Sequence, residues 1–164
     1  MRSRLTALAL TLCTHTPACA TITSRSAHIA TPTERAAVDA VLDDWHAAAA
    51  ASELDRYMRH MAETGVFLGT DATERWSKSE LRTYAARPFA AGHGWRMRAR
   101  RRAVSVLGDV AYFDEDLETV SLGPARGTGV LALEAGRWRI LQYNLTITVP
   151  NERFGAVHAL LAAP

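Results

Sequence analysis

Residues 126–151 read as two long β-strands, and apolar and polar residues alternate along the second of them. The strands flank a tight turn at residues 134–136, where Gly136 can supply the positive φ that such a turn needs. The alternation predicts one face of the second strand with Trp138, Ile140, Gln142, Asn144 and Thr146, and an opposite face with Arg139, Leu141, Tyr143, Leu145 and Ile147. The first face combines large apolar groups with side-chain amides, which suits the wall of a ligand cavity.

Helical periodicity dominates residues 31–90. Thr31 and Glu34 form a capping box at the start of one predicted helix, and Ser77 and Glu80 form another at the start of a later helix. The later helix is expected to stop before Pro88, because a proline disfavours the helical conformation of the residue that precedes it. The apolar faces are predicted to be Val38, Val41, Leu42, Trp45 and Ala49, then Leu54, Tyr57, Met58 and Met61, then Leu81, Tyr84 and Ala85.

Shorter elements complete the predicted order. Ser52 can cap a short second helix, and Asn151 can cap a last helix near the C-terminus. A short strand is expected at residues 65–69, followed by a loop at 70–76. Two longer strands are expected at residues 95–106 and 110–122.

Arginine dominates residues 96–102, a run that by composition resembles a nucleic-acid-binding patch. A hairpin that pairs Val106 with Val110 would place three opposite charges across from these arginines. The predicted pairs are Arg102 with Asp114, Arg100 with Asp116, and Arg98 with Glu118. Because the neighbouring strand cancels the positive charge, we expect a charge ladder on a solvent face and no nucleic-acid partner.

The first twenty residues have the pattern of an export signal. Arg2 and Arg4 precede a short apolar run, and small residues at 18–20 have the spacing that a signal peptidase reads. The run is too short to span a bilayer, so no membrane span is expected. Lipidation at Cys19 is the alternative to simple cleavage. We expect the protein to be periplasmic or extracellular. The chain is predicted to divide into a signal peptide at residues 1–20, a flexible linker at 21–30 and one domain at 31–164.

Removal of this segment changes both the charge and the chemistry of the chain. Cys13 and Cys19 lie inside it, so the mature chain has no thiol for a disulfide, a zinc site or catalysis. Loss of its two arginines reduces 19 basic residues to 17, which balances the 17 acidic ones. The remaining histidines share no short metal-binding spacing, and the Gly-Thr-Gly at residues 127–129 lacks the third glycine of a dinucleotide-binding motif. We expect neither a metal nor a cofactor.

The predicted element order resembles the nuclear transport factor 2-like superfamily, specifically its SnoaL-like domains. Four stretches carry the resemblance: VFLGTDATERW at 66–76, AYFDE at 111–115, RGTGVL at 126–131 and WRI at 138–140. The resemblance covers roughly residues 33–151. It implies an α+β fold, in which a cone-shaped, curved antiparallel sheet wraps around three N-terminal helices and encloses a pocket, with a short C-terminal helix after it. It also implies a homodimer that forms through the sheet.

The resemblance argues against one chemistry of this superfamily. Ketosteroid isomerases carry an oxyanion tyrosine and two aspartates, and the matching positions here are Trp45, Leu68 and Gly129. The three catalytic side chains are therefore missing, although the Trp45 indole could still donate a hydrogen bond. Isomerisation of that kind is not expected.

The candidate site combines the predicted inner faces of the helices and the sheet. Phe113, Glu115 and Leu117 should face inward, because the residues between them are assigned to the charge ladder. The predicted ligand-binding residues are Trp45, Tyr57, Phe67, Trp76, Tyr84, Phe113, Glu115, Trp138, Gln142 and Asn144. Glu115 and Asp71 are the candidate general bases, and the alternative for each is a strand salt bridge or a loop cap. Burial would raise the pKa of Glu115 unless Gln142 or the Trp45 indole donates a hydrogen bond to it.

Three functions stay open at this point. The first is an exported domain that binds a small, partly apolar molecule in its pocket without converting it. The second is an enzyme that carries out proton transfer, hydration, dehydration or cyclisation with Glu115 or Asp71 as general base. The third is a dimerisation module.

Overall fold

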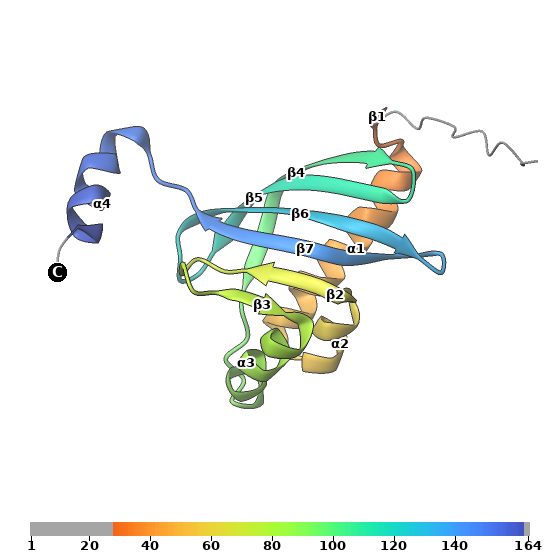
Figure 1. Ribbon diagram of the computed structural model, residues 1–164, viewed down its shortest axis with the longest axis horizontal. Helices are drawn as coiled ribbons and strands as arrows, with labels where there is room; N and C mark the ends of the chain where they lie inside the picture. Colours follow the sequence, from red (N-terminus) through yellow and green to blue (C-terminus); the bar gives the residue numbers. More distant parts are fainter. Residues whose placement is uncertain (1–27, 163–164) are drawn as a thin grey trace, which may run out of the picture.

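The computed structural model describes residues 28–162, which form a curved seven-stranded sheet with helices against its inner side (Figure 1). The elements in chain order are β1 (His28–Ile29), α1 (Pro32–Ala50), α2 (Leu54–Arg59), β2 (Met61–Leu68), β3 (Arg75–Ser77), α3 (Lys78–Ala90), β4 (Met97–Leu107), β5 (Val110–Thr119), β6 (Pro124–Glu134), β7 (Arg137–Ile147), η1 (Asn151–Arg153) and α4 (Phe154–Leu161). This architecture confirms the predicted α+β fold.

The strand order in the sheet is β1-β4-β5-β6-β7-β2-β3. Strands β4 to β7 form an antiparallel meander, as predicted. β2, however, lies beside β7 in the parallel direction, so the sheet is mixed and not purely antiparallel. The reason is the path of the chain, which crosses from β3 through α3 to the other part of the sheet before the meander begins.

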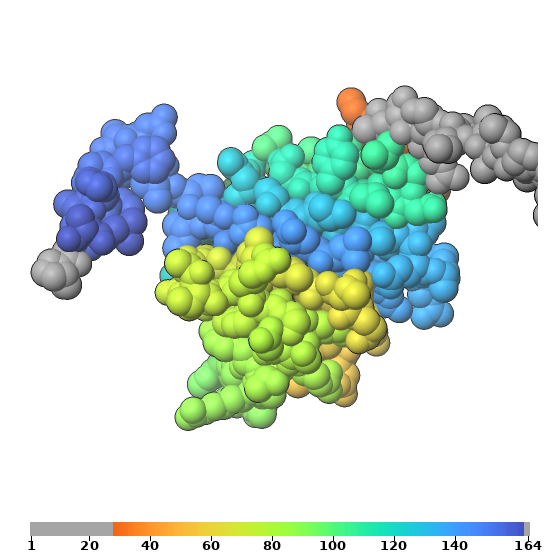
Figure 2. All heavy atoms as spheres, viewed as in Figure 1, coloured from red at the N-terminus to blue at the C-terminus, as the bar shows by residue number. Residues whose placement is uncertain are grey.

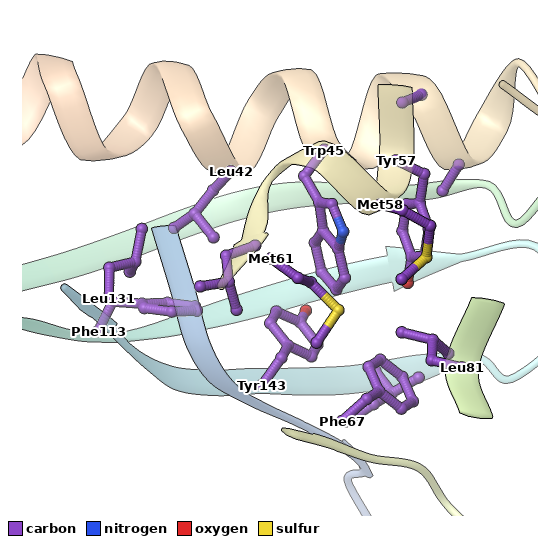
Figure 3. Close-up of a cluster of buried hydrophobic side chains, with 14 of the residues drawn as sticks. Leu42, Trp45, Tyr57, Met58, Met61, Phe67, Leu81, Phe113, Leu131 and Tyr143 are labelled. Atoms are coloured by element: carbon purple, nitrogen blue, oxygen red, sulfur yellow. The ribbon is translucent and has the colours of Figure 1, made fainter. Parts of the chain in front are cut away.

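Helix α1 lies along the inner side of the sheet and supplies much of the core. Its predicted capping box is present: the Thr31 hydroxyl accepts from the Glu34 N–H, and the Glu34 carboxylate accepts from the Thr31 N–H at 2.9 Å. Val38, Leu42 and Trp45 on its inner face are fully buried. Figure 3 shows Leu42 and Trp45 directed from the helix toward the side chains of Phe113, Leu131 and Tyr143 on the sheet. Burial of each large apolar side chain stabilises the fold by about 1.5–3 kcal/mol.

A β-bulge at Arg100 changes the register of the predicted charge ladder. Arg98 pairs with Glu118, as predicted, but the next ladder pair beyond Leu117 joins Asp116 to Arg101 and leaves Arg100 as the extra residue. The predicted Arg100–Asp116 and Arg102–Asp114 pairs are therefore wrong. Because a bulge shifts every following side chain to the opposite face, Arg102 turns inward and is only 7 % exposed.

The arginines that stay outside still meet carboxylates. The Nε of Arg101 lies 2.9 Å from an Asp116 oxygen, and its guanidinium also lies 3.7 Å from Asp114. Arg100 lies 3.5 Å from Glu118, which also pairs with Arg98. The charge ladder thus exists on the outer face, with partners moved by one residue after the bulge.

A second β-bulge lies at Leu141 in β7. Val130 pairs with Gln142, whereas the next residue, Leu131, pairs with Ile140. Beyond the bulge the inner face is therefore Tyr143 and Leu145, which are buried. The prediction that Gln142 and Asn144 share the inner face with Ile140 is wrong, because the alternation that it assumed is interrupted at this bulge.

Several local predictions also differ from the structure. α3 continues past Pro88, because the following Phe89 is buried against the core. Ser52 has φ +60° and does not cap α2, and Asn151 begins η1 without a side-chain cap. The expected loop ends in β3, which pairs with β2, and the expected linker ends in β1, which pairs with β4. The predicted signal peptide lies outside the described residues.

Helix α4 stands apart from the body of the protein, to which residues 148–150 connect it (Figures 1 and 2). None of its side chains is buried. Within residues 28–162, no helix is long and apolar enough to cross a bilayer. On the sheet itself, Tyr112 and Gln142 share an exposed row of the outer face. The homodimer predicted to form through this sheet stays a prediction.

Candidate functional site

A cavity of about 540 Å³ opens at the end of the sheet where β2, β5 and β7 finish and β4 begins. We call it the mouth cavity. Its walls come from β2 and the loop after it, from α3 and the segment that follows it, and from the turn between β5 and β6. The lining residues are Phe67, Gly69, Thr70, Glu74, Trp76, Tyr84, Gly92, His93, Gly94, Trp95, Arg96, Met97, Thr119, Val120, Ser121, Leu122 and Leu145. Its volume lies within the range of about 300–1,000 Å³ that is usual for small-molecule sites.

Four aromatic rings follow one another along one side of this cavity. The ring centroids of Phe67 and Trp76 are 5.9 Å apart, those of Trp76 and Tyr84 are 4.2 Å apart, and those of Tyr84 and Trp95 are 5.9 Å apart. The first two pairs are stacked, and the third is tilted. Tyr84 remains 49 % exposed, so this aromatic wall is not sealed by the rest of the core. It offers flat apolar faces to a ligand.

Trp95 holds its place in the wall through the backbone. Its N–H donates to the carbonyl of Ala49 at the end of α1, at 3.0 Å. The preceding residue, Gly94, comes so close to α1 that an added Cβ would lie 2.3 Å from the same carbonyl oxygen. A glycine is therefore needed here, because a larger residue would push the segment away from α1.

A buried ion cluster lies between α1 and the sheet, deeper than the mouth cavity. We define it as Arg102, Glu115, His46 and Tyr143. One Glu115 oxygen accepts from the Tyr143 hydroxyl at 2.8 Å and lies 2.8 Å from Nε2 of His46. The other lies 2.8 Å from both Nε and Nη2 of Arg102. All four side chains are buried, and Glu115 has no exposed surface.

The cluster keeps Glu115 ionised in spite of its burial. Burial alone would raise the pKa of Glu115, but the hydrogen bond and charge of His46, the charge of Arg102 and the Tyr143 hydroxyl together hold it below its ordinary value. The expected donors, Gln142 and the Trp45 indole, do not take part. Burial, reinforced by the neighbouring carboxylate, also raises the pKa of Tyr143 well above its ordinary value, so this hydroxyl keeps its proton.

Arg102 connects the cluster to the surface of α1. Its Nη1 lies 2.8 Å from Asp39 and its Nη2 lies 3.0 Å from Asp43. Burial favours the neutral form of Arg102, but Glu115 and Asp39 hold the pKa above its ordinary value. Both oxygens of Glu115 and the Arg102 guanidinium are thus paired within a salt-bridge network, the kind of structure that sets the register of neighbouring elements.

Three buried polar atoms in or beside the cluster have no hydrogen-bond partner among the described residues: His46 Nδ1, which belongs to the cluster, and Trp45 Nε1 and the Tyr57 hydroxyl beside it. The three rings are neighbours, because the Trp45 centroid lies 5.2 Å from that of His46 and 4.8 Å from that of Tyr57. Burial raises the pKa of Tyr57 well above its ordinary value.

The structure brings together only part of the predicted ligand site. Phe67, Trp76 and Tyr84 line the mouth cavity. Trp45, Tyr57, Phe113 and Glu115 lie in the closed core beneath it, Trp138 is half-buried at the start of β7, and Gln142 and Asn144 face outward. The ligand-binding role of each stays a prediction.

The two candidate bases lie in different surroundings. Glu115 faces inward, as the strand alternation predicted, but its carboxylate does not line the cavity. Asp71 is exposed in the loop after β2, where it accepts from the Thr73 N–H at 2.8 Å and from the Thr73 hydroxyl at 2.5 Å. These hydrogen bonds lower the pKa of Asp71, and they match the loop-cap alternative. Neither carboxylate is presented to the mouth cavity.

Sequence reasoning missed other lining residues. Leu145 was predicted to face away from the cavity, because the residue pattern of β7 does not reveal the bulge at Leu141. The other missed residues share a place in turns or irregular segments, where no periodicity identifies an inner face. They include His93, Trp95, Arg96 and residues 120–122. The glycines at 92 and 94 were the one local signal: Gly92 has positive φ, and Gly94 marks a close backbone approach beside Trp95.

Residues 38–150 match the family model of the SnoaL-like domain. No curated protein matches the chain.

Solved structures share the fold at low sequence identity. They include an NTF2-like protein of unknown function from Pseudomonas putida, with 13 % identity, a TM-score of 0.62 and coverage of 76 % of this chain and 93 % of that one. A domain of unknown function with a cystatin-like fold from Nostoc punctiforme has 15 % identity, a TM-score of 0.63 and coverage of 82 % and 90 %. A protein of unknown function from Mycobacterium tuberculosis has 19 % identity, a TM-score of 0.64 and coverage of 74 % and 75 %. These likenesses concern the fold alone.

Proposed function

The chain belongs to the SnoaL-like domain family, and from this premise we propose that it binds a small, partly apolar molecule against the aromatic wall of the mouth cavity. The observation that carries the proposal is the wall itself. Phe67, Trp76, Tyr84 and Trp95 form a continuous series of rings along an open cavity of suitable size. Planar molecules gain contact area and favourable ring–ring geometry on such a surface.

The proposal is for binding without conversion. A general base must lie within hydrogen-bond reach of the proton that it removes. Glu115 is fully buried, and both of its oxygens are engaged by the buried ion cluster. Asp71 is engaged by Thr73 at the surface. For catalysis, either carboxylate would have to leave its present partners and turn toward the cavity. Ligand binding on the aromatic wall needs no such movement.

Substitution of Trp76 tests the proposal. Isothermal titration of the protein with 2-naphthamide, a neutral planar probe, should show binding, and Trp76→Ala should weaken it about tenfold, because the substitution removes the central ring of the wall. Tyr112→Ala is the matched control, since Tyr112 is 47 % exposed on the outer face of the sheet and does not line the cavity. Its affinity should stay within twofold of the wild-type value. Equal losses in the two variants would contradict the proposal.

We also propose that the protein is exported, on the strength of its N-terminal pattern. Arg2 and Arg4, the apolar run that follows them and the small residues at 18–20 support cleavage after Ala20. N-terminal sequencing of the protein recovered from the periplasm or the medium should begin at Thr21. A chain that still begins at Met1, or one that begins with a lipidated Cys19, would overturn this proposal.

A further inference from the structure

Just before the arginine-rich strand β4 lies a cation, Arg96, that forms no ion pair with any residue that the structure describes. The paired part of β4 and β5 ends where Met97 meets Thr119. Arg98, Arg100, Arg101 and Arg102 all have carboxylate partners on β5, but Arg96 lies one residue beyond the ladder. The chain across from it continues as Val120, Ser121 and Leu122, which carry no charge. Within residues 28–162, Arg96 forms no ion pair.

Arg96 instead lines the mouth cavity, next to the aromatic wall. It directly follows Trp95, whose backbone is anchored to the end of α1. The backbone of Arg96 is therefore held beside the wall, and the residue is exposed. An arginine in this position can donate two parallel hydrogen bonds to a planar anionic group.

The only carboxylate in the lining belongs to Glu74, and it is turned onto its own loop. One of its oxygens accepts from the Asp71 N–H at 3.2 Å. The same side chain lies so close to Gly69 that a Cβ there would be 2.0 Å from this oxygen. Gly69 thus makes room for Glu74 to fold back over the loop. His93 and Ser121 add further hydrogen-bond donors to the lining.

We propose that the mouth cavity selects a planar aromatic anion, whose ring lies on the aromatic wall and whose charge is held by Arg96. This inference rests on the proposed binding function and adds the ligand class. The ligand should contain an aromatic ring because the wall consists of the rings of Phe67, Trp76, Tyr84 and Trp95. It should carry a negative charge because Arg96 lies beside this wall and forms no ion pair with a described residue. A carboxylate is the simplest group that fits the guanidinium.

Two probes of the same shape test the charge requirement. 2-Naphthoate and 2-naphthamide share the fused ring and differ in charge, and each is titrated into the full-length mature protein at low ionic strength. We expect the wild-type protein to bind the naphthoate about tenfold more tightly, because a charge-assisted pair replaces a neutral contact. Arg96→Gln should remove this preference by weakening naphthoate binding about tenfold, with a change of less than twofold for the naphthamide.

Arg98→Gln is the matched control. It removes the same charge two residues further along the chain, but Arg98 is paired with Glu118 and lies outside the cavity lining. Its affinities for both probes should stay within twofold of wild type, and melting curves should show that all variants are folded. Equal wild-type affinities for the two probes, or a preference that persists in Arg96→Gln, would overturn this inference and leave the proposed binding function intact. Failure of both probes to bind would overturn the binding function as well.

Discussion

Replacement of Arg102 by alanine is expected to lower the free energy of unfolding by about 3–5 kcal/mol. The physical reason is that Glu115 would stay buried and ionised after losing the guanidinium that contacts one of its oxygens at 2.8 Å. Asp39 and Asp43 would lose the same partner. Chemical denaturation followed by circular dichroism measures the loss.

Two further variants separate this effect from a general loss of positive charge. Arg101→Ala removes the neighbouring arginine, which faces solvent, and should leave the free energy of unfolding nearly unchanged. Adding Glu115→Gln to Arg102→Ala should recover part of the stability, because the unpaired buried charge disappears. Equal losses in Arg101→Ala and Arg102→Ala would show that the buried ion cluster does not contribute as its geometry indicates.

Gly127→Ala is expected to destabilise the protein by about 3 kcal/mol. A Cβ at residue 127 would lie 2.2 Å from the Tyr143 hydroxyl oxygen and 2.8 Å from a Glu115 oxygen. The methyl group would therefore force Tyr143 away from Glu115 and break a buried hydrogen bond of 2.8 Å. The effect arises from crowding inside the sheet, and thermal or chemical unfolding would show it.

The control for this glycine lies in α4. Gly155→Ala adds the same methyl group where nothing lies within 4 Å, so the stability of the body should change by less than about 0.5 kcal/mol. In the Gly127→Ala background, Tyr143→Phe should recover part of the loss, because it removes the atom that the new methyl group would strike first. If Gly127→Ala is as stable as the wild type, the tight contact between β5, β6 and β7 is not required.

Local sequence signals predicted several features of the site correctly. The capping boxes at Thr31 and Ser77 set the starts of α1 and α3, because the side chains that satisfy the first N–H groups lie within three residues. The turn at residues 134–136 forms with positive φ at Ala135 and Gly136, as a tight hairpin requires. Alternation along β5 placed Glu115 on the inner face.

The partners of Glu115 could not be predicted in the same way. Arg102 reaches it only because the bulge at Arg100 turns the strand over, and Tyr143 reaches it only because of the bulge at Leu141. His46 comes from α1, 69 residues away in the chain. A bulge adds one residue without a distinctive composition, so two strands with regular alternation give no sign of it.

The sequence alone was enough to predict the order of the main helices and strands, the starts of α1 and α3, and the hairpin turn at residues 134–136. These depend on neighbours within a few residues and on periodicity. The burial of Arg102 could be seen only in the folded chain. The same holds for Arg96, which forms no ion pair within residues 28–162, and for the mouth cavity, which is open where the core beneath it is closed. The physical reason is that bulges, sheet curvature and the packing of α1 on the sheet arise from contacts between distant segments, which choose the face that each side chain takes.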